Sequence, residues 1–172
     1  MIMMSGYEND YVGILRAAQI LKPDVKMMVG VYGLATEQMN KDFHDLVQNV
    51  AGTAVLSYPP IFKTDDGKKF AESFKAKFGK YPDYNAVYGY VAAQMLFEGL
   101  AKVPNGDASL ASLAAELRKT DAETLLGHVR FDERGDNPDF IQRIAQHQGD
   151  QLVLISPANA ATGQVKLPGR SW

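Results

Sequence analysis

The chain contains no cysteine, and this absence excludes several kinds of site at once. Disulfides, thiolate nucleophiles and cysteine-ligated zinc centres all need that residue, and none of the 172 residues is a cysteine. The three histidines, His44, His128 and His147, fall in different predicted segments, and no pair has the spacing of metal ligands on one element. We therefore expect no metal and no cofactor.

Charge and hydropathy exclude two further classes of partner. Lysine and arginine total 18 against 20 aspartate and glutamate, a formal net charge of −2, so no basic face for nucleic acid is predicted. No apolar run is long enough to predict a membrane-spanning helix. The first residues also lack the basic and apolar segments of a signal peptide, which leaves the cellular compartment open on these grounds.

Catalytic motifs are absent as well. There is no phosphate-binding glycine loop with a following lysine, and no Gly-x-Ser-x-Gly nucleophile motif. Glu8 and Asp10 could form an acid/base pair, but acidic residues at the start of a helix also complement its dipole, and we favour that interpretation. Asp132 and Asp136 frame a turn sequence rather than a cation loop. We predict that the chain is not an enzyme.

The first third of the sequence alternates between short apolar runs and amphipathic stretches. This repeat, roughly 25 residues long, predicts an α/β fold with a parallel sheet and flanking helices. The predicted strands are 1–5, 26–31 and 54–57, and the predicted helices are 9–21 and 36–50. A buried strand at residue 1 is an unusual start for a domain, so we expect a chain that lacks its first half.

The remaining sequence predicts helices first and strands afterwards. Helices are expected over 65–78, 84–102 and 109–119, and strands over 127–131, 141–146 and 151–155. The helix 84–102 is apolar nearly all round and should be deeply buried. The last two strands are joined by Gln148-Gly149-Asp150, which predicts a β-hairpin near the C-terminus. After Ser156, a segment rich in proline, alanine and glycine predicts an extended or loose tail.

Tyrosines gather where predicted strands end. In open α/β sheets, ligands bind beyond the carboxyl ends of the strands, and Gly6, Tyr7 and Tyr32 occupy such positions. A tyrosine offers a ring and one polar group, which suits a pocket for a small organic molecule. The alternative is a tyrosine-rich core, and both interpretations stay open for Tyr7 and Tyr32. For Tyr88 and Tyr90, inside a predicted buried helix, we favour packing.

The order of the motifs resembles a known family. The motifs include Ser5-Gly6-Tyr7 after a strand, Gly30-x-x-Gly33, Ala86-x-x-Gly89-Tyr90 and Gly127-x-Val129-x-Phe131-Asp132-x-x-Gly135-Asp136. In this order and spacing, the chain resembles the C-terminal half of type I periplasmic solute-binding proteins, the branched-chain amino acid receptor family of ABC importers. The resemblance implies two α/β lobes joined by crossover segments, with the solute held between them.

On that plan, the chain contributes parts of both lobes. Residues 1–80 would form the second half of the C-terminal lobe, and 81–83 a hinge crossing. Residues 84–147 would return to the N-terminal lobe, and 148–172 would be a crossing strand and C-terminal tail. The sheet edges left exposed would be covered by the missing N-terminal half or in a dimer.

The resemblance also implies binding residues and partners. Tyr7 matches the family's aromatic residue at the ligand, with Gly6 beside it and Tyr84 a third candidate at the hinge exit. Tyr32 stands where amino-acid receptors place the carboxylate that pairs with the ligand ammonium. An unpaired buried ammonium is costly, so we expect an aromatic acid, an amide or an amino-acid-like solute. A membrane permease and a periplasmic location follow from the family; the alternative is an intracellular ligand-sensing module of the same fold.

Overall fold

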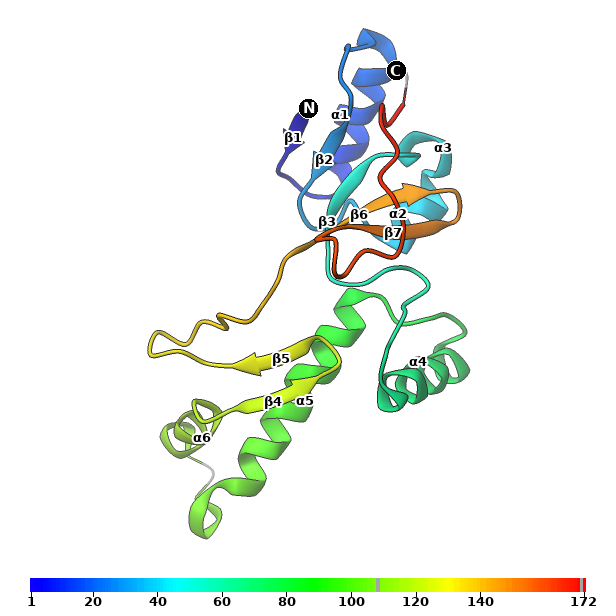
Figure 1. The fold of residues 1–172 in the computed structure, drawn as a ribbon. Helices are drawn as coiled ribbons and strands as arrows, with labels where there is room; N and C mark the ends of the chain where they lie inside the picture. The colour runs from blue at the N-terminus through cyan, green and yellow to red at the C-terminus, as the bar shows by residue number, and fades with distance from the viewer. Residues whose placement is uncertain (108, 171) are drawn as a thin grey trace. The chain divides into compact units, whose positions relative to one another are not determined.

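The computed structural model describes residues 1–107, 109–170 and 172, which fold as two compact units (Figure 1). The first unit comprises Met1–Ile61, Ala71–Asp83 and Gln142–Trp172, and the second comprises Phe62–Phe70 and Tyr84–Ile141. Helix α4 (Asp65–Phe78) contributes residues to both. No helix in the described residues has the length and apolarity needed to cross a membrane.

The first unit is built on a five-stranded mixed sheet in the order β1-β2-β3-β6-β7. Strands β1 (Ile2–Met4), β2 (Met28–Gly30) and β3 (Ala51–Ala54) are parallel, as predicted. Strand β6 (Arg143–Gln148) runs antiparallel to β3 and forms the predicted C-terminal hairpin with β7 (Gln151–Ser156). The sequence-based prediction of an α/β fold with a parallel sheet, flanking helices and a hairpin is therefore confirmed.

Helices cover the parallel part of this sheet and form its core. Helix α1 (Glu8–Leu21) buries Tyr11 and Leu15 completely, and they pack with Val47 of α3 (His44–Val47). Burial of each such side chain contributes about 1.5–3 kcal/mol relative to exposure. The core thus lies directly behind the strands whose ends carry the predicted site.

The C-terminal tail wraps the first unit rather than hanging loose. The Gln146 side chain bonds the backbone N–H and C=O of Lys166, and the Gly169 N–H donates to the Lys26 carbonyl at 2.6 Å. Arg170 donates to two carbonyls in α3, and Trp172 packs against the core. The sequence predicted either an extended or a loose tail, and the described residues of the tail adopt the extended form.

The second unit combines helices with a two-stranded hairpin. Its elements are α5 (Tyr84–Lys102), a 3₁₀ turn (Pro104–Gly106), α6 (Leu110–Leu117), β4 (Asp121–Thr124) and β5 (Gly127–Arg130). Helix α5 has its predicted bounds, but Leu96 is 40% and Phe97 67% exposed. The prediction of deep burial is thus wrong for this face, because within the described second unit α5 packs mainly on α6.

Two boundaries differ from the sequence-based prediction. The helix expected over 36–50 is broken at Phe43 into α2 (Glu37–Asp42) and α3, and the strand expected over 54–57 begins at Ala51. Asn49 adopts a positive φ of 60° and ends the helical segment before Gly52. Residues 143–147, which the sequence-based prediction groups with the segment 84–147, form part of β6 beside β3 in the first unit.

Candidate functional site

The predicted binding residues Gly6, Tyr7 and Tyr32 lie at one edge of the first unit's sheet. Gly6 and Tyr7 follow β1, Tyr32 follows β2, and these strands are parallel neighbours, so their carboxyl ends share that edge. Tyr7 is 85% exposed and Tyr32 41% exposed, so both side chains reach solvent. The fourth predicted residue, Tyr84, begins α5 in the second unit, where its ring meets that of Tyr88 edge-on at 6.3 Å.

A buried tyrosine joins the two strand-end loops. Tyr11 is fully buried, and its hydroxyl accepts a hydrogen bond from the Gly6 N–H at 3.2 Å and donates to the Tyr32 carbonyl at 3.5 Å. One hydroxyl therefore holds the backbone of both loops. Sequence reasoning did not single out Tyr11, because its hydrogen bonds cross from one loop to another.

The loop that carries Tyr32 is anchored from below. Leu34 is fully buried, and its carbonyl accepts a hydrogen bond from His147 Nε2 at 2.9 Å. Gly30 lies so close to Leu34 that a Cβ at residue 30 would stand 2.6 Å from Leu34 Cδ2. At the loop's end, the Thr36 hydroxyl accepts from the Met39 N–H at 3.1 Å and caps α2. Tyr32 thus projects from a fixed base.

Gln142 connects Tyr32 to the neighbouring strand. The Tyr32 hydroxyl donates to Gln142 Oε1 at 2.5 Å, and Gln142 Nε2 donates to the Ala54 carbonyl at 2.9 Å, where β3 ends. Gln142 is the first residue of the first unit after the chain leaves the second. Sequence reasoning missed it, since no local pattern relates two residues 110 positions apart.

The acidic pair at the start of α1 has divided roles. Asp10 Oδ2 accepts the Tyr7 N–H at 2.8 Å and so satisfies an N-terminal helix donor. This confirms the structural interpretation of Asp10. The side-chain stem of Glu8 lies against Gly33, with its Cγ 3.5 Å from where a Cβ of residue 33 would stand. Glu8 therefore belongs to the same strand-end edge as Tyr32.

A separate open pocket of about 270 Å³ lies beside α2 and was not predicted. Its walls mix acidic, basic and neutral polar groups: Glu37, Asn40, Lys41, His44, Tyr58 and Asp150. Burial, and then the negative charge of Glu37, raise the pKa of the Tyr58 hydroxyl above its usual value. Asn40 Nδ2 donates to the Gly149 carbonyl at 3.0 Å, and His44 Nδ1 lies 3.7 Å from Asp150 Oδ1.

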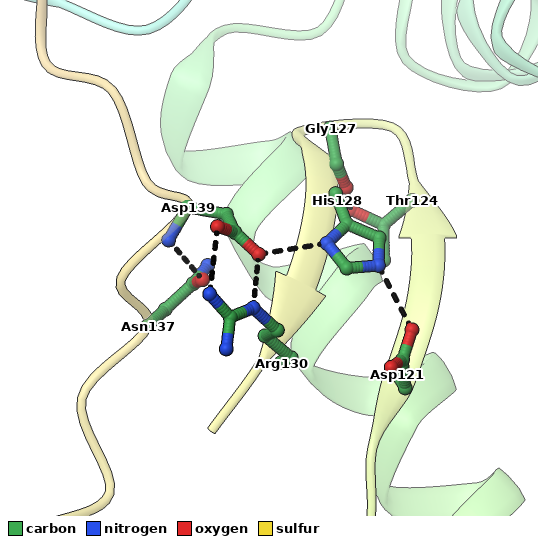
Figure 2. A network of polar contacts seen from close by, with 7 residues as sticks. All are labelled: Asp121, Thr124, Gly127, His128, Arg130, Asn137 and Asp139. Carbon is green, nitrogen blue, oxygen red and sulfur yellow. Dashed lines mark hydrogen bonds and ion pairs between the residues drawn. The ribbon is translucent and has the colours of Figure 1, made fainter. Parts of the chain in front are cut away.

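The second unit carries a polar network on its hairpin (Figure 2). His128 Nδ1 lies 2.8 Å from Asp139 Oδ2, and His128 Nε2 lies 2.9 Å from Asp121 Oδ1. Arg130 binds both carboxylate oxygens of Asp139, with Nε at 2.6 Å and Nη2 at 3.3 Å. Two carboxylates facing both ring nitrogens favour the doubly protonated imidazolium. The network ties the hairpin to the segment that leads back to β6.

This arrangement predicts the pH dependence of the hairpin. Hydrogen bonds from Asp139 and then Asp121 raise the pKa of His128 above its ordinary 6.5. Protonated His128 therefore contributes its full stabilisation below about pH 6.5. This contribution is lost as the pH rises through the raised pKa of His128. NMR titration of the His128 ring should show Asp139→Asn lowering the pKa more than Asp121→Asn. A wild-type value at or below 6.5 would contradict the network.

In the connecting segment, Asp132 forms the predicted turn. Its Oδ1 accepts the N–H groups of Arg134 and Asp136, each at 2.9 Å. The carboxylate thus satisfies backbone donors in the manner of an Asx turn. The interpretation of Asp132 and Asp136 as a turn sequence is confirmed.

Comparison with known proteins decides the family. A family model described as periplasmic binding protein matches residues 1–162. The chain belongs to this family. Leu/Ile/Val-binding protein homolog 7 of Brucella suis biovar 1 (strain 1330) is 25% identical to it over 97% of the chain and 43% of the relative. The chain spans less than half the length of this relative, and the resemblance to type I receptors of branched-chain amino acid importers is confirmed.

Solved structures of periplasmic binding proteins share the fold. The leucine binding protein LivK of Thermotoga maritima MSB8 superposes with a TM-score of 0.78 at 22% identity, over 90% of this chain and 43% of its own. A solute binding protein of an ABC transporter from R. palustris, in complex with benzoate, gives a TM-score of 0.69 at 17% identity, over 99% and 44%. These identities establish the fold alone.

Proposed function

We propose that the chain takes part in the non-catalytic capture of a small organic solute for an ABC importer. The observation that carries the proposal is the strand-end edge, where Gly6, Tyr7 and Tyr32 stand on loops joined by Tyr11. Exposed tyrosines on a rigid base suit recognition of an organic molecule. Membership of the periplasmic binding protein family supplies the functional class.

We extend the proposal to the lobes and partners. The first unit would correspond to the second half of the C-terminal lobe, and the second unit to the returning part of the N-terminal lobe. Tyr84 would then be a ligand contact supplied by the second unit. A membrane permease would receive the solute, and the periplasm would be the site of action. The part of the family's length that this chain does not span would complete the two sheets.

The solute itself is best sought among amino acids and aromatic acids or amides. The relatives' names point to leucine, isoleucine and valine, and a fold neighbour was solved with benzoate. The position of Tyr32, which carries no charge, departs from the family's carboxylate and favours a solute that does not depend on that charge. Whether the solute is an amino acid or an aromatic acid or amide therefore depends on the residues of this chain.

Calorimetric titration tests the proposal directly. The purified protein is titrated with L-leucine, L-isoleucine, benzoate and benzamide, and thermal shifts are recorded in parallel. At 100 times its Kd, a bound solute should stabilise the fold by about 2.7 kcal/mol. Tyr32→Ala should weaken binding roughly tenfold or more, as expected for loss of a central aromatic contact.

Tyr90→Ala serves as the matched control. Tyr90 lies on α5, where its ring packs against Phe70, and is not one of the strand-end residues, so its truncation should leave the affinity unchanged. A folded protein that binds no member of the panel even at millimolar concentration would contradict the proposal. Equal losses from Tyr32→Ala and Tyr90→Ala would remove Tyr32 from the site.

A further inference from the structure

We infer that Gln142 sets the polarity of the Tyr32 hydroxyl, so that the site selects a solute group that donates a hydrogen bond to Tyr32. This inference rests on the proposed function and deepens it, because it names the chemistry of the solute at this position. Ammonium, amide N–H and hydroxyl groups meet the requirement, whereas a carboxylate does not. Three hydrogen bonds of Gln142 fix this polarity.

The orientation of the Gln142 amide is fixed first. Its Nε2 lies 2.9 Å from the Ala54 carbonyl and 3.1 Å from the Arg143 carbonyl. A carbonyl oxygen can only accept, so the amide must turn its NH₂ toward both of them. Exchanging Nε2 and Oε1 would place three acceptors together. The Oε1 atom of Gln142 is consequently directed to Tyr32.

The proton of Tyr32 follows from that orientation. A phenol has a single O–H donor, and Oε1 of an amide has none. At 2.5 Å between the two oxygens, Tyr32 must therefore donate its proton to Gln142. Toward any further group, the Tyr32 oxygen acts as an acceptor. A carboxylate placed there would meet lone pairs, and the unmade hydrogen bond would weaken its binding.

The surroundings of Tyr32 agree with this polarity. The stem of Glu8 lies against Gly33, the next residue after Tyr32, and so brings a carboxylate to the same edge. The neighbouring cation, Arg143, directs Nη1 to the carbonyl of Val55. An acceptor hydroxyl beside an acidic side chain favours a group that donates a hydrogen bond.

The test compares solutes that differ only in this polarity. Benzamide and benzoate have nearly the same shape, as do L-leucine and 4-methylpentanoate apart from the amino group. For each pair, the ratio of Kd values is measured by calorimetry in the wild type and in Gln142→Met. Loss of the amide frees the Tyr32 proton to donate, so the preference for the donor-bearing solute should fall roughly tenfold, the size of one hydrogen bond.

Further variants separate the contributions. Tyr32→Phe should abolish the effect of Gln142→Met, because the hydroxyl is gone. Glu8→Gln should weaken L-leucine more than benzamide, since only the former carries a cation. Gln38→Met is the matched control: Gln38 bonds Asp42 on the exposed side of α2, and its loss should leave every ratio unchanged.

Thermal denaturation of the same variants tests the hydrogen bond without a solute. If Tyr32 and Gln142 are bonded, the double variant should melt no lower than the less stable single variant. Additive losses would show that the bond is absent and would overturn the inference. If the bond is present but no probe binds, the proposed function fails and the inference fails with it. If probes bind and Gln142→Met leaves the ratios unchanged, only the inference is overturned.

Discussion

Between about pH 7 and pH 4, the first unit should lose about 3 kcal/mol of its free energy of unfolding through His147 alone. Burial lowers the pKa of this imidazole from 6.5 to about 4. The two pKa values differ by 2.5, and each unit of difference corresponds to 1.36 kcal/mol, so about 3 kcal/mol is lost by pH 4. For a protein of ordinary stability, this is a large fraction of the total.

The cause lies in the surroundings of the ring. His147 is fully buried on β6, and Nε2–H donates to the Leu34 carbonyl. Its Nδ1 is buried with no hydrogen-bond partner among the described residues. A proton on Nδ1 would create an unpaired buried charge, which the fold disfavours. The unfolded chain therefore binds the proton more readily, and stability falls as the pH drops below 6.5.

His147→Gln should remove this dependence while keeping an N–H donor for Leu34. Urea denaturation followed by the fluorescence of Trp172, the only tryptophan, reports on the first unit because that ring packs on its core. The variant should be less stable than the wild type at pH 7, yet its stability should fall by about 3 kcal/mol less on acidification.

His44→Gln is the comparison variant, because the charge of His44 is the last-ranked cause that lowers the pKa of His147, after burial. It should keep most of the acid dependence of the wild type. A wild type and His147→Gln variant with parallel stability curves between pH 4 and 7 would show that His147 does not carry the effect. Since Leu34 supports the loop of Tyr32, solute affinity should weaken only as the pH approaches about 4, where His147 takes up its proton in the folded protein.

The helices and strands that were predicted correctly are those whose ends are marked by residues nearby in the sequence. Helix α4 begins at two aspartates and ends before Gly79, which has a positive φ of 74°. Helix α5 lies between a proline-containing break and the Pro104 turn, and its bounds are as predicted. The strand-end positions of Tyr7 and Tyr32 also followed from local patterns, because a parallel sheet places such ends together.

Hydrogen bonds between residues far apart in the sequence could not be predicted from such local patterns. The insertion of β6 beside β3 depends on pairing between residues about 90 positions apart, and the hydrogen bond of Tyr32 to Gln142 spans 110. Strand β4 was missed since Asp121-Ala-Glu-Thr has an acidic, non-β composition. The roles of Tyr11, Gln142 and His147 in the site could be found only once the fold had brought them together.

Gly52→Val should lower the stability of the first unit by about 2–3 kcal/mol and displace the loop that carries Tyr32. Gly52 lies within β3, and a Cβ there would stand 3.0 Å from both the backbone nitrogen and the Cβ of Ala35. Ala35 is a buried residue of that loop and cannot turn aside. A branched side chain must therefore push the loop away from the strand ends, and solute affinity should fall together with stability.

Gly13→Ala in α1 is the informative contrast within the same unit. No atom lies within 4 Å of a Cβ at that position, and the residue is exposed in mid-helix. The substitution should stabilise the unit by about 0.5–1 kcal/mol and leave solute affinity unchanged. If Gly52→Val instead proved neutral, as the high β-propensity of valine would allow in an open strand, the close packing of the loop on β3 would be disproved. The rigid base proposed for Tyr32 would then lose its main support.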